Sequence, residues 1–182
     1  MSERKRCKWC NMKNPIYVKY HDTEWGVPRF DDAYLFEMLL LESFQAGLSW
    51  ECVLNKREAF RDAFDGFDAK LISEYGEEKL SELAQNKAII RNKLKIRAAK
   101  TNAVVFLAIV REFGSFISYL ERFTESRTVY ENDKTTSRLS DAISRDLCSR
   151  GMKFTGTTVV YSYLQAIGII YSHSDECFLH KM

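Results

Sequence analysis

Apolar side chains recur every three or four residues over most of the chain, which is the spacing of an amphipathic helix. This pattern predicts helices over about residues 31–44, 49–66, 68–76, 77–85, 91–113, 115–123, 140–150 and 156–170. Asp31 and Asp68 can cap two of these helices, and Gly114 is a natural end for the longest one. No segment alternates steadily between apolar and polar positions, and residues 124–139 are predicted to form a loop. The sequence therefore predicts an all-α fold.

Composition supports this class. The chain of 182 residues contains only 8 glycines and 2 prolines, whereas these two residue types make up roughly 12% of average proteins. So few turn-forming residues argue against an all-β fold. Hydrophobic residues are 46% and charged residues 29% of the chain, which is typical of a globular protein. The length fits a single folded unit over residues 1–182.

The cysteine count and the apolar runs predict a compartment. The longest uninterrupted apolar run, Ala103 to Val110, is too short to span a bilayer, and the basic N-terminus is not followed by an apolar segment. Five cysteines in a chain with no recognisable signal peptide indicate a reducing environment rather than a disulfide framework. We therefore expect a cytoplasmic protein with no membrane partner, whose cysteines are candidates for metal binding.

Charge is unevenly distributed although the formal net charge is only +2. Residues 83–111 carry seven basic residues and no acid, whereas residues 51–82 carry nine acids and five bases. A basic helix start after two short helices fits a helix–hairpin–helix, in which backbone N–H groups and Lys or Arg side chains bind a DNA phosphate. The candidates here are Arg91, Lys93 and Lys95. On charge alone, a solvated helix face is slightly favoured over a DNA contact.

Glu42 is the most informative acidic residue, because it follows Leu35 by seven positions and Leu39 by three. It therefore shares the apolar face of its predicted helix. A buried carboxylate needs a partner or becomes protonated. Glu42 is either exposed beyond an earlier helix end, paired with a structural cation, or part of a pocket for a polar or cationic ligand.

Aromatic residues crowd the same part of the sequence, and all three tryptophans lie in the first 50 positions. Such residues are usually core, but their ring faces also attract cations and stack on nucleobases. The candidates are Trp9, Tyr17, Tyr20, Trp25, Phe44 and Trp50.

Four cysteine and histidine side chains suit a structural Zn²⁺ ion. His173 and Cys177 have the i, i+4 spacing that places two ligands on one side of a helix. Cys7 and Cys10 form a C-x2-C pair in the sequence, and His21 follows fourteen residues after Cys7. Ligands at both ends of the chain would join the termini. Unligated cysteines remain the alternative, and a catalytic zinc is not expected because the sequence contains no HExxH motif.

Several uncommon strings occur in order along nearly the whole chain. They are Tyr17-Val-Lys-Tyr-His-Asp-Thr-Glu-Trp-Gly-Val-Pro28, Leu41-Glu-Ser-Phe-Gln-Ala-Gly-Leu-Ser-Trp50, Ile89-Ile-Arg-Asn-Lys-Leu-Lys-Ile96 and Lys153-Phe-Thr-Gly-Thr-Thr158. With Arg6-Cys7 and His173-x3-Cys177, they closely resemble the DNA-3-methyladenine glycosylase I family, from about residue 6 to residue 177. The resemblance implies an all-α fold of the helix–hairpin–helix glycosylase superfamily that hydrolyses the N-glycosidic bond of 3-methyladenine in alkylated DNA.

The resemblance also implies roles for individual residues. Cys7, His21, His173 and Cys177 match the ligands of one structural zinc that ties the termini together. Glu42, Tyr20 and Trp50 match base-pocket positions, with Tyr17 and Trp25 nearby and Trp9 in the same wall. The family lacks the catalytic aspartate common elsewhere in its superfamily, and we expect Glu42 to be the catalytic residue. We expect an ionised Glu42 to accept hydrogen bonds from the base. The string that carries Glu42 and Trp50 contains no lysine, and we expect no lyase chemistry.

Further expectations concern DNA. Leu48, after Gly47, is either an apolar wedge that fills the vacated base stack or a core residue, with neither favoured. Lys153 is a candidate DNA-backbone contact. The partners are then alkylated double-stranded DNA and the released base, and the protein is expected to be a monomer.

Two departures from the family pattern bear on these expectations. Ala88 replaces the usual hairpin glycine, which weakens the phosphate grip unless the turn keeps an ordinary φ. Cys10 has no counterpart among the family's ligands. The alternatives are a zinc-stapled DNA-binding module that recognises modified bases without cleaving them, and a glycosylase with a shifted substrate such as 3-methylguanine, with Phe44 altering the pocket.

Overall fold

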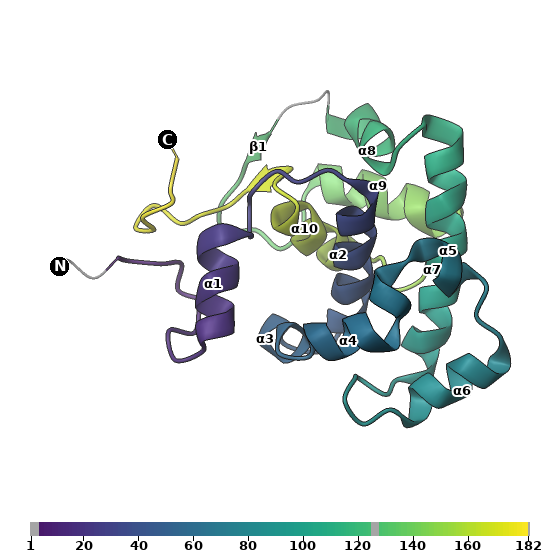
Figure 1. Ribbon diagram of the computed structural model, residues 1–182. Coiled ribbons are helices and arrows are strands. Elements are labelled where there is room, and N and C mark those ends of the chain that lie inside the picture. The colour runs from purple at the N-terminus through teal and green to yellow at the C-terminus, as the bar shows by residue number, and fades with distance from the viewer. Residues whose placement is uncertain (1–3, 125–127, 182) are drawn as a thin grey trace.

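A computed structural model describes residues 4–124 and 128–181 (Figure 1). The protein is mostly helical over these ranges. In chain order the elements are α1 (Pro15–Thr23), α2 (Asp32–Gln45), α3 (Trp50–Leu54), α4 (Arg57–Ala63), a 3-10 turn (Asp65–Phe67), α5 (Ala69–Ser73), α6 (Glu77–Gln85), α7 (Lys93–Phe113), α8 (Phe116–Thr124), β1 (Val129–Tyr130), α9 (Arg138–Ser149), α10 (Thr157–Ala166) and β2 (Ile170–Tyr171). The predicted helical class is confirmed, with one small addition of strand.

Helix α2 is the central element, and α7, α8, α10 and α3 pack around it (Figure 1). Every residue from Tyr34 to Phe44 is buried, because this helix is apolar on nearly all sides. Asp31 caps its start as predicted, accepting the backbone N–H of Tyr34 at 2.9 Å. The carboxyl end of α2 therefore brings Glu42 into the interior.

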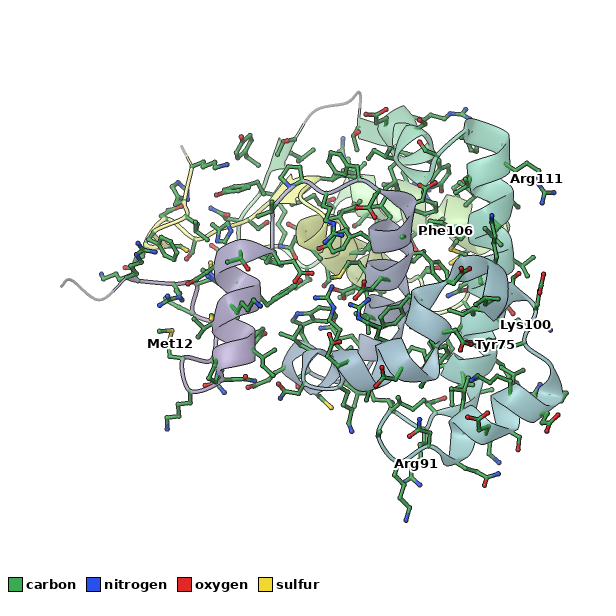
Figure 2. All side chains as sticks on the ribbon, viewed as in Figure 1. Met12, Tyr75, Arg91, Lys100, Phe106 and Arg111 are labelled. Carbon is green, nitrogen blue, oxygen red and sulfur yellow. The ribbon has the colours of Figure 1, made fainter. Side chains whose placement is uncertain are left out.

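Helix α7 is the longest helix and forms the outer wall. Asn92 caps its first turn, and Gly114 ends it with a φ of 85°, close to the predicted bounds. Phe106 points inward to Phe36 of α2, with ring centroids 5.0 Å apart (Figure 2). No single helix in the described ranges is long and apolar enough to cross a membrane, although the bent pair α7 and α8 meets the length and composition requirement together.

The predicted helix over residues 49–66 is wrong as a single element, because it breaks into α3, α4 and a 3-10 turn. Tertiary contacts hold the break. The Asn55 amide oxygen accepts the Asn14 amide at 2.9 Å, and the Lys56 ammonium donates to the carbonyl of Ala88 at 2.9 Å. Gly66, at the predicted end, has a φ of 69° in the 3-10 turn.

Two other predicted bounds need correction. Helix α5 ends at Ser73, and Gly76 caps the start of α6 instead of closing α5. The last helix ends at Ala166, and Gly168 two residues later has a non-helical φ of 79°. Glycine is required there, because an added Cβ would lie 2.6 Å from the backbone nitrogen of Pro28. The chain then forms β2, which pairs in parallel with β1 in the predicted loop. These two-residue strands are too short to show alternation in the sequence.

Helix α1 was not predicted, although Asn14 followed by Pro15 is a recognisable helix start. The Asn14 side chain accepts the backbone N–H groups of Ile16 and Tyr17. Figure 1 shows the described N-terminal and C-terminal segments on the same side of the molecule as α1. The backbone N–H of Phe178 donates to the carbonyl of Lys5 at 2.9 Å, so the two terminal segments are in direct contact.

Candidate active site and metal centre

The four predicted metal ligands converge although they are separated by up to 170 positions. His173 Nδ1 lies 3.5 Å from the Sγ atoms of both Cys7 and Cys177, and His21 Nε2 lies 3.5 Å from Cys177 Sγ. All four donor atoms lie within 4.8 Å of one another, and all four residues are buried. A tetrahedral Zn²⁺ places neighbouring sulfur and nitrogen ligands about 3.5 Å apart. The donor set and its spacing therefore fit a structural metal ion.

The outer contacts of the cluster orient its histidines. His21 Nδ1 lies 2.8 Å from one carboxylate oxygen of Asp22. Arg6 donates one hydrogen bond of 2.7 Å to each of the two oxygens of the same carboxylate. His173 Nε2 lies 3.3 Å from the carbonyl of Trp25. Burial, with the neighbouring His21, lowers the pKa of His173 to about 4. The imidazole is therefore neutral near pH 7, which is the form that binds a metal.

Sequence reasoning missed Asp22, although an acid adjacent to a histidine ligand is a recognisable orienting partner. Two other candidates fall outside the cluster. Cys10 is buried, but its Sγ lies 3.9 Å from the carbonyl of Tyr17, and His180 binds the carbonyl of His173 at 2.9 Å through Nδ1. The Cys7-x2-Cys10 pair is therefore not the ligand pair in this structure.

A cavity of about 560 Å³ lies next to this cluster. Glu42 and five of the six candidate aromatic residues, all except Phe44, line one part of it: Trp9, Tyr17, Tyr20, Trp25, Glu42 and Trp50. Cys7 of the metal cluster also lines it. The remaining lining residues are polar and were not predicted to line a pocket: Arg6, Lys8, Gln45, Asn132, Asp133, Lys134, Ser162, Gln165, Ser172, Ser174, Asp175 and Glu176. These residues come from segments that have no common sequence signal.

Glu42 lies on the cavity wall and is only 3% exposed. Its Oε2 atom has no hydrogen-bond partner. Burial raises the pKa of this carboxyl well above its usual value, because the interior favours the uncharged form. The first two alternatives for Glu42, an exposed residue and a partner of a structural cation, therefore fail in the described part of the chain. Without a ligand, burial favours the protonated carboxyl. The expected ionised state concerns Glu42 with a base bound, and it stays a prediction.

The aromatic wall has its own unpartnered polar group. The rings of Tyr20 and Trp50 have centroids 5.4 Å apart, and the indole Nε1 of Trp50 is buried without an acceptor. Trp9 packs against Tyr17 and Trp25, at 5.3 and 4.8 Å. The cavity therefore combines ring surfaces with one unused hydrogen-bond donor and one unused carboxyl oxygen.

One expectation about the pocket is wrong. Phe44 is fully buried against Phe60 and Phe64, with centroids 4.8 and 5.8 Å away, so it does not shape the cavity. Two lysines, Lys8 and Lys134, also line the cavity. Both residues are exposed, and the ammonium of Lys134 pairs with Glu131 at 3.0 Å.

Leu48 projects from a tight turn at the end of α2. The backbone N–H of Leu48 donates to the carbonyl of Gln45, with Ala46 at φ −45° and ψ 114° and Gly47 at φ 79°. These angles define a type II turn, whose third position requires a left-handed φ and therefore favours glycine. Leu48 is 42% exposed, which excludes the core interpretation. We call residues 45–48 the wedge turn.

The predicted DNA-binding cations fall into two groups in the structure, exposed and buried. Arg91, Lys93 and Lys153 are exposed, and Arg91 points away from the body of the molecule (Figure 2). Lys95 is only 5% exposed, and its ammonium donates to the carbonyls of Phe44, at 2.8 Å, and Ala46. The predicted DNA contact of Lys95 is therefore wrong for this structure, because the side chain is used internally.

Other cations in the basic stretch are also occupied. Lys100 donates to the carbonyl of Tyr75 at 2.7 Å, and these two residues lie together in Figure 2. Arg97 pairs with Glu77 at 2.6 Å. Both side chains therefore already have partners within the protein.

Ala88 lies in the connector between α6 and α7. Non-glycine residues with a positive φ in the described ranges are Asp65, Phe67, Asp133 and Phe154, so Ala88 has an ordinary φ. Its backbone N–H donates to the Asn86 side chain at 2.9 Å. The turn therefore does not require the missing glycine.

Comparisons with known proteins agree with one another. The methyladenine glycosylase family model matches residues 9–180. DNA-3-methyladenine glycosylase 1 of Escherichia coli is 41% identical over 179 residues, covering 94% of this chain and 95% of the relative. The Haemophilus influenzae DNA-3-methyladenine glycosylase is 37% identical, covering 94% and 96%. A Staphylococcus aureus 3-methyladenine DNA glycosylase I structure, concerned with 3-methyladenine recognition, has a TM-score of 0.90 at 30% identity and covers 96% and 97%.

Proposed function

The chain belongs to the methyladenine glycosylase family, and we propose that it removes 3-methyladenine from alkylated DNA by hydrolysing the N-glycosidic bond. The observation that carries this proposal is the unpartnered carboxyl of Glu42 in an aromatic cavity. A buried, unpartnered carboxyl is costly unless a ligand supplies a donor or a positive charge. 3-Methyladenine supplies both, because methylation at N3 leaves the base cationic.

The ligand thereby reverses the ionisation preference of Glu42. In the empty cavity, burial favours the protonated carboxyl. A cationic base nearby favours the carboxylate, which accepts hydrogen bonds from the base edge. Ordinary adenine lacks the charge, so it gains less from this site.

The aromatic rings and the Glu42 carboxylate make the remaining contributions to binding and catalysis. Tyr20 and Trp50 stack on the flipped base, contributing roughly 1–3 kcal/mol per stacked base, and cation–π attraction adds preference for the lesion. The glycosidic bond of the cationic base is already weak, so water attacks C1′ without prior protonation of the leaving group. The Glu42 carboxylate stabilises positive charge on the sugar. We propose no lyase step.

The DNA face is formed by three segments that meet at the start of α7. They are the wedge turn, the 86–92 connector with Arg91 and Lys93, and the turn bearing Lys153. Lys95 joins the first two, and Asn102 of α7 binds the backbone N–H of Lys153 at 2.8 Å. The positive end of the α7 dipole and the exposed cations favour a phosphate, as in the helix–hairpin–helix superfamily. Leu48 fills the space that the flipped base leaves.

The Cys7, His21, His173 and Cys177 cluster is proposed to hold one Zn²⁺. Its role is structural, because four protein ligands leave no open position for water. It fixes the terminal segments that carry Trp9 and close the cavity. The five cysteines are free, which fits a reducing compartment, and we propose that the protein acts in the cytoplasm as a monomer.

The test is release of free 3-methyladenine from methylated duplex DNA, measured by chromatography. Glu42→Gln is expected to lower the rate by about 10²–10³-fold, the usual cost of removing one electrostatic contact to a transition state. Duplex affinity should stay near that of the wild type, because Glu42 lies inside the cavity.

Glu74→Gln, the same change at an exposed position, is the matched control and should retain full activity. Binding of methylated DNA by the wild type without release of any base would replace the proposal with the non-enzymatic binding module. Preferential release of 3-methylguanine would replace the substrate. Unchanged release by Glu42→Gln would remove Glu42 from the mechanism.

A further inference from the structure

The ammonium group of Lys95 is buried at the junction of three segments. It lies in the first turn of α7 and donates to the carbonyls of Phe44 and Ala46 at the end of α2. The ring of Phe154, in the turn before α10, lies 5.9 Å from the same nitrogen. No carboxylate in the described ranges pairs with it, and burial alone lowers its pKa. This cation is therefore held by backbone carbonyls and one ring face.

Those two carbonyls belong to the part of α2 where the chain leaves the helix. The last carbonyls of a helix have no internal partners, and a cation there satisfies them and interacts favourably with the helix dipole. Ala46 is also the second residue of the wedge turn, so its carbonyl orientation sets where Leu48 projects. Lys95 thus fixes the wedge turn through its backbone.

Lys93 lies in the same turn of α7, and its side chain is exposed. Two residues apart, one lysine is exposed on the proposed DNA face and the other is bonded to the wedge turn. Resting on the function proposed above, we propose that Lys95 is a positioning residue that fixes Leu48 relative to the DNA backbone held at the start of α7. Binding of the phosphates and insertion of the wedge then occur in one rigid frame.

Asn102 supports this role for α7 independently. It lies seven residues after Lys95, on the same buried face, and its side chain makes two hydrogen bonds to the backbone of Lys153, at 2.9 and 2.8 Å. One helix face therefore binds the backbone of two separate turns on the proposed DNA face through buried polar side chains.

The test compares Lys95→Met with the wild type on methylated duplex and methylated single-stranded DNA. Wedge insertion matters for extracting a stacked base, and much less where the base is already unstacked. Release from the duplex is expected to fall about 10–100-fold, the cost of a small misplacement. Release from the single strand should fall much less. Affinity for free 3-methyladenine, followed by tryptophan fluorescence, should be unchanged.

Two controls and a second variant complete the design. Lys95→Arg keeps a buried cation and should recover duplex activity, whereas Lys70→Met removes an exposed lysine and should change nothing. If Lys95→Met yields little folded protein, Lys95→Gln keeps an N–H donor without the charge and is measured in its place.

Three results would overturn the proposal. Equal losses on duplex and single-stranded DNA would indicate damage to the cavity. A salt dependence of duplex affinity that weakens by about one phosphate contact would make Lys95 a DNA ligand. Wild-type rates on both substrates would leave it without a role. If the wild type itself releases no base, the proposed function fails, and this is seen before any variant is compared.

Discussion

Two buried polar clusters lie side by side in this protein, and they differ in how their polar atoms are used. In the Cys/His cluster, each histidine has an oxygen partner outside the cluster for its other ring nitrogen, and the four metal-ligating atoms lie close together. In the cavity, Glu42 and Trp50 each keep a buried polar atom without a partner. The first arrangement suits a permanent occupant. The second suits a ligand that comes and goes.

The difference has an energetic meaning. An unsatisfied buried polar group costs about 1–3 kcal/mol of folding free energy, and a ligand that pairs with it recovers part of that cost. A fully oriented ligand set instead adds metal-binding energy to folding. The cavity therefore lowers stability where a ligand can bind, whereas a metal ion held by the neighbouring cluster would raise it.

The largest expected effect is loss of the metal. Cys177→Ser should release zinc and lower the free energy of unfolding by several kcal/mol, because metal binding and folding are coupled. Zinc content by atomic absorption and thermal unfolding would measure this. Cys10→Ser, which changes a buried cysteine outside the cluster, should keep about one zinc per chain. A native protein free of zinc would end the contrast between the two clusters.

Weakening the outer contacts should have a smaller effect. Asp22→Ala removes the partner of His21 Nδ1 and should lower zinc affinity about 10–100-fold. Asp22→Asn keeps an acceptor and should fall between this variant and the wild type in a competition titration with a chelator. Equal affinities for all three proteins would show that His21 does not need orienting.

The cavity should respond in the opposite direction. Burial raises the pKa of Glu42 in the folded protein above its value in the unfolded chain. The stability that this carboxyl contributes is therefore fully present below the usual carboxyl pKa, and it is lost as pH rises through the higher folded-state pKa. Glu42→Gln should therefore unfold at a higher temperature than the wild type near pH 7.5, by an amount worth about 1–3 kcal/mol. The difference should shrink near pH 4. A variant less stable than the wild type at both pH values would contradict an unpartnered carboxyl.

The smallest effect is expected on the proposed DNA face. Lys93→Ala should reduce the salt dependence of duplex affinity by about one phosphate contact. Arg97→Ala should reduce it less, because Arg97 already pairs with Glu77. Binding isotherms at several salt concentrations would measure both. Identical slopes for the two variants would remove the distinction between free and occupied cations.

Local patterns in the sequence determined much of this picture. The helical period and the caps placed α2 and α7, since neighbours in the chain settle these features. The same period placed Glu42 on an apolar face, and its burial confirms that placement. The uncommon strings identified the family, because they match in order over nearly the whole length.

Tertiary structure decided what depends on residues far apart in the chain. Only the fold brings Cys7 to His173, and only the carbonyls at the end of α2 turn Lys95 from a predicted DNA contact into an internal one. The break at Asn55 likewise depends on Asn14. Periodicity reports which face of a helix is apolar. It does not report which segment meets that face, because chain closure over long separations is set by packing of the whole core.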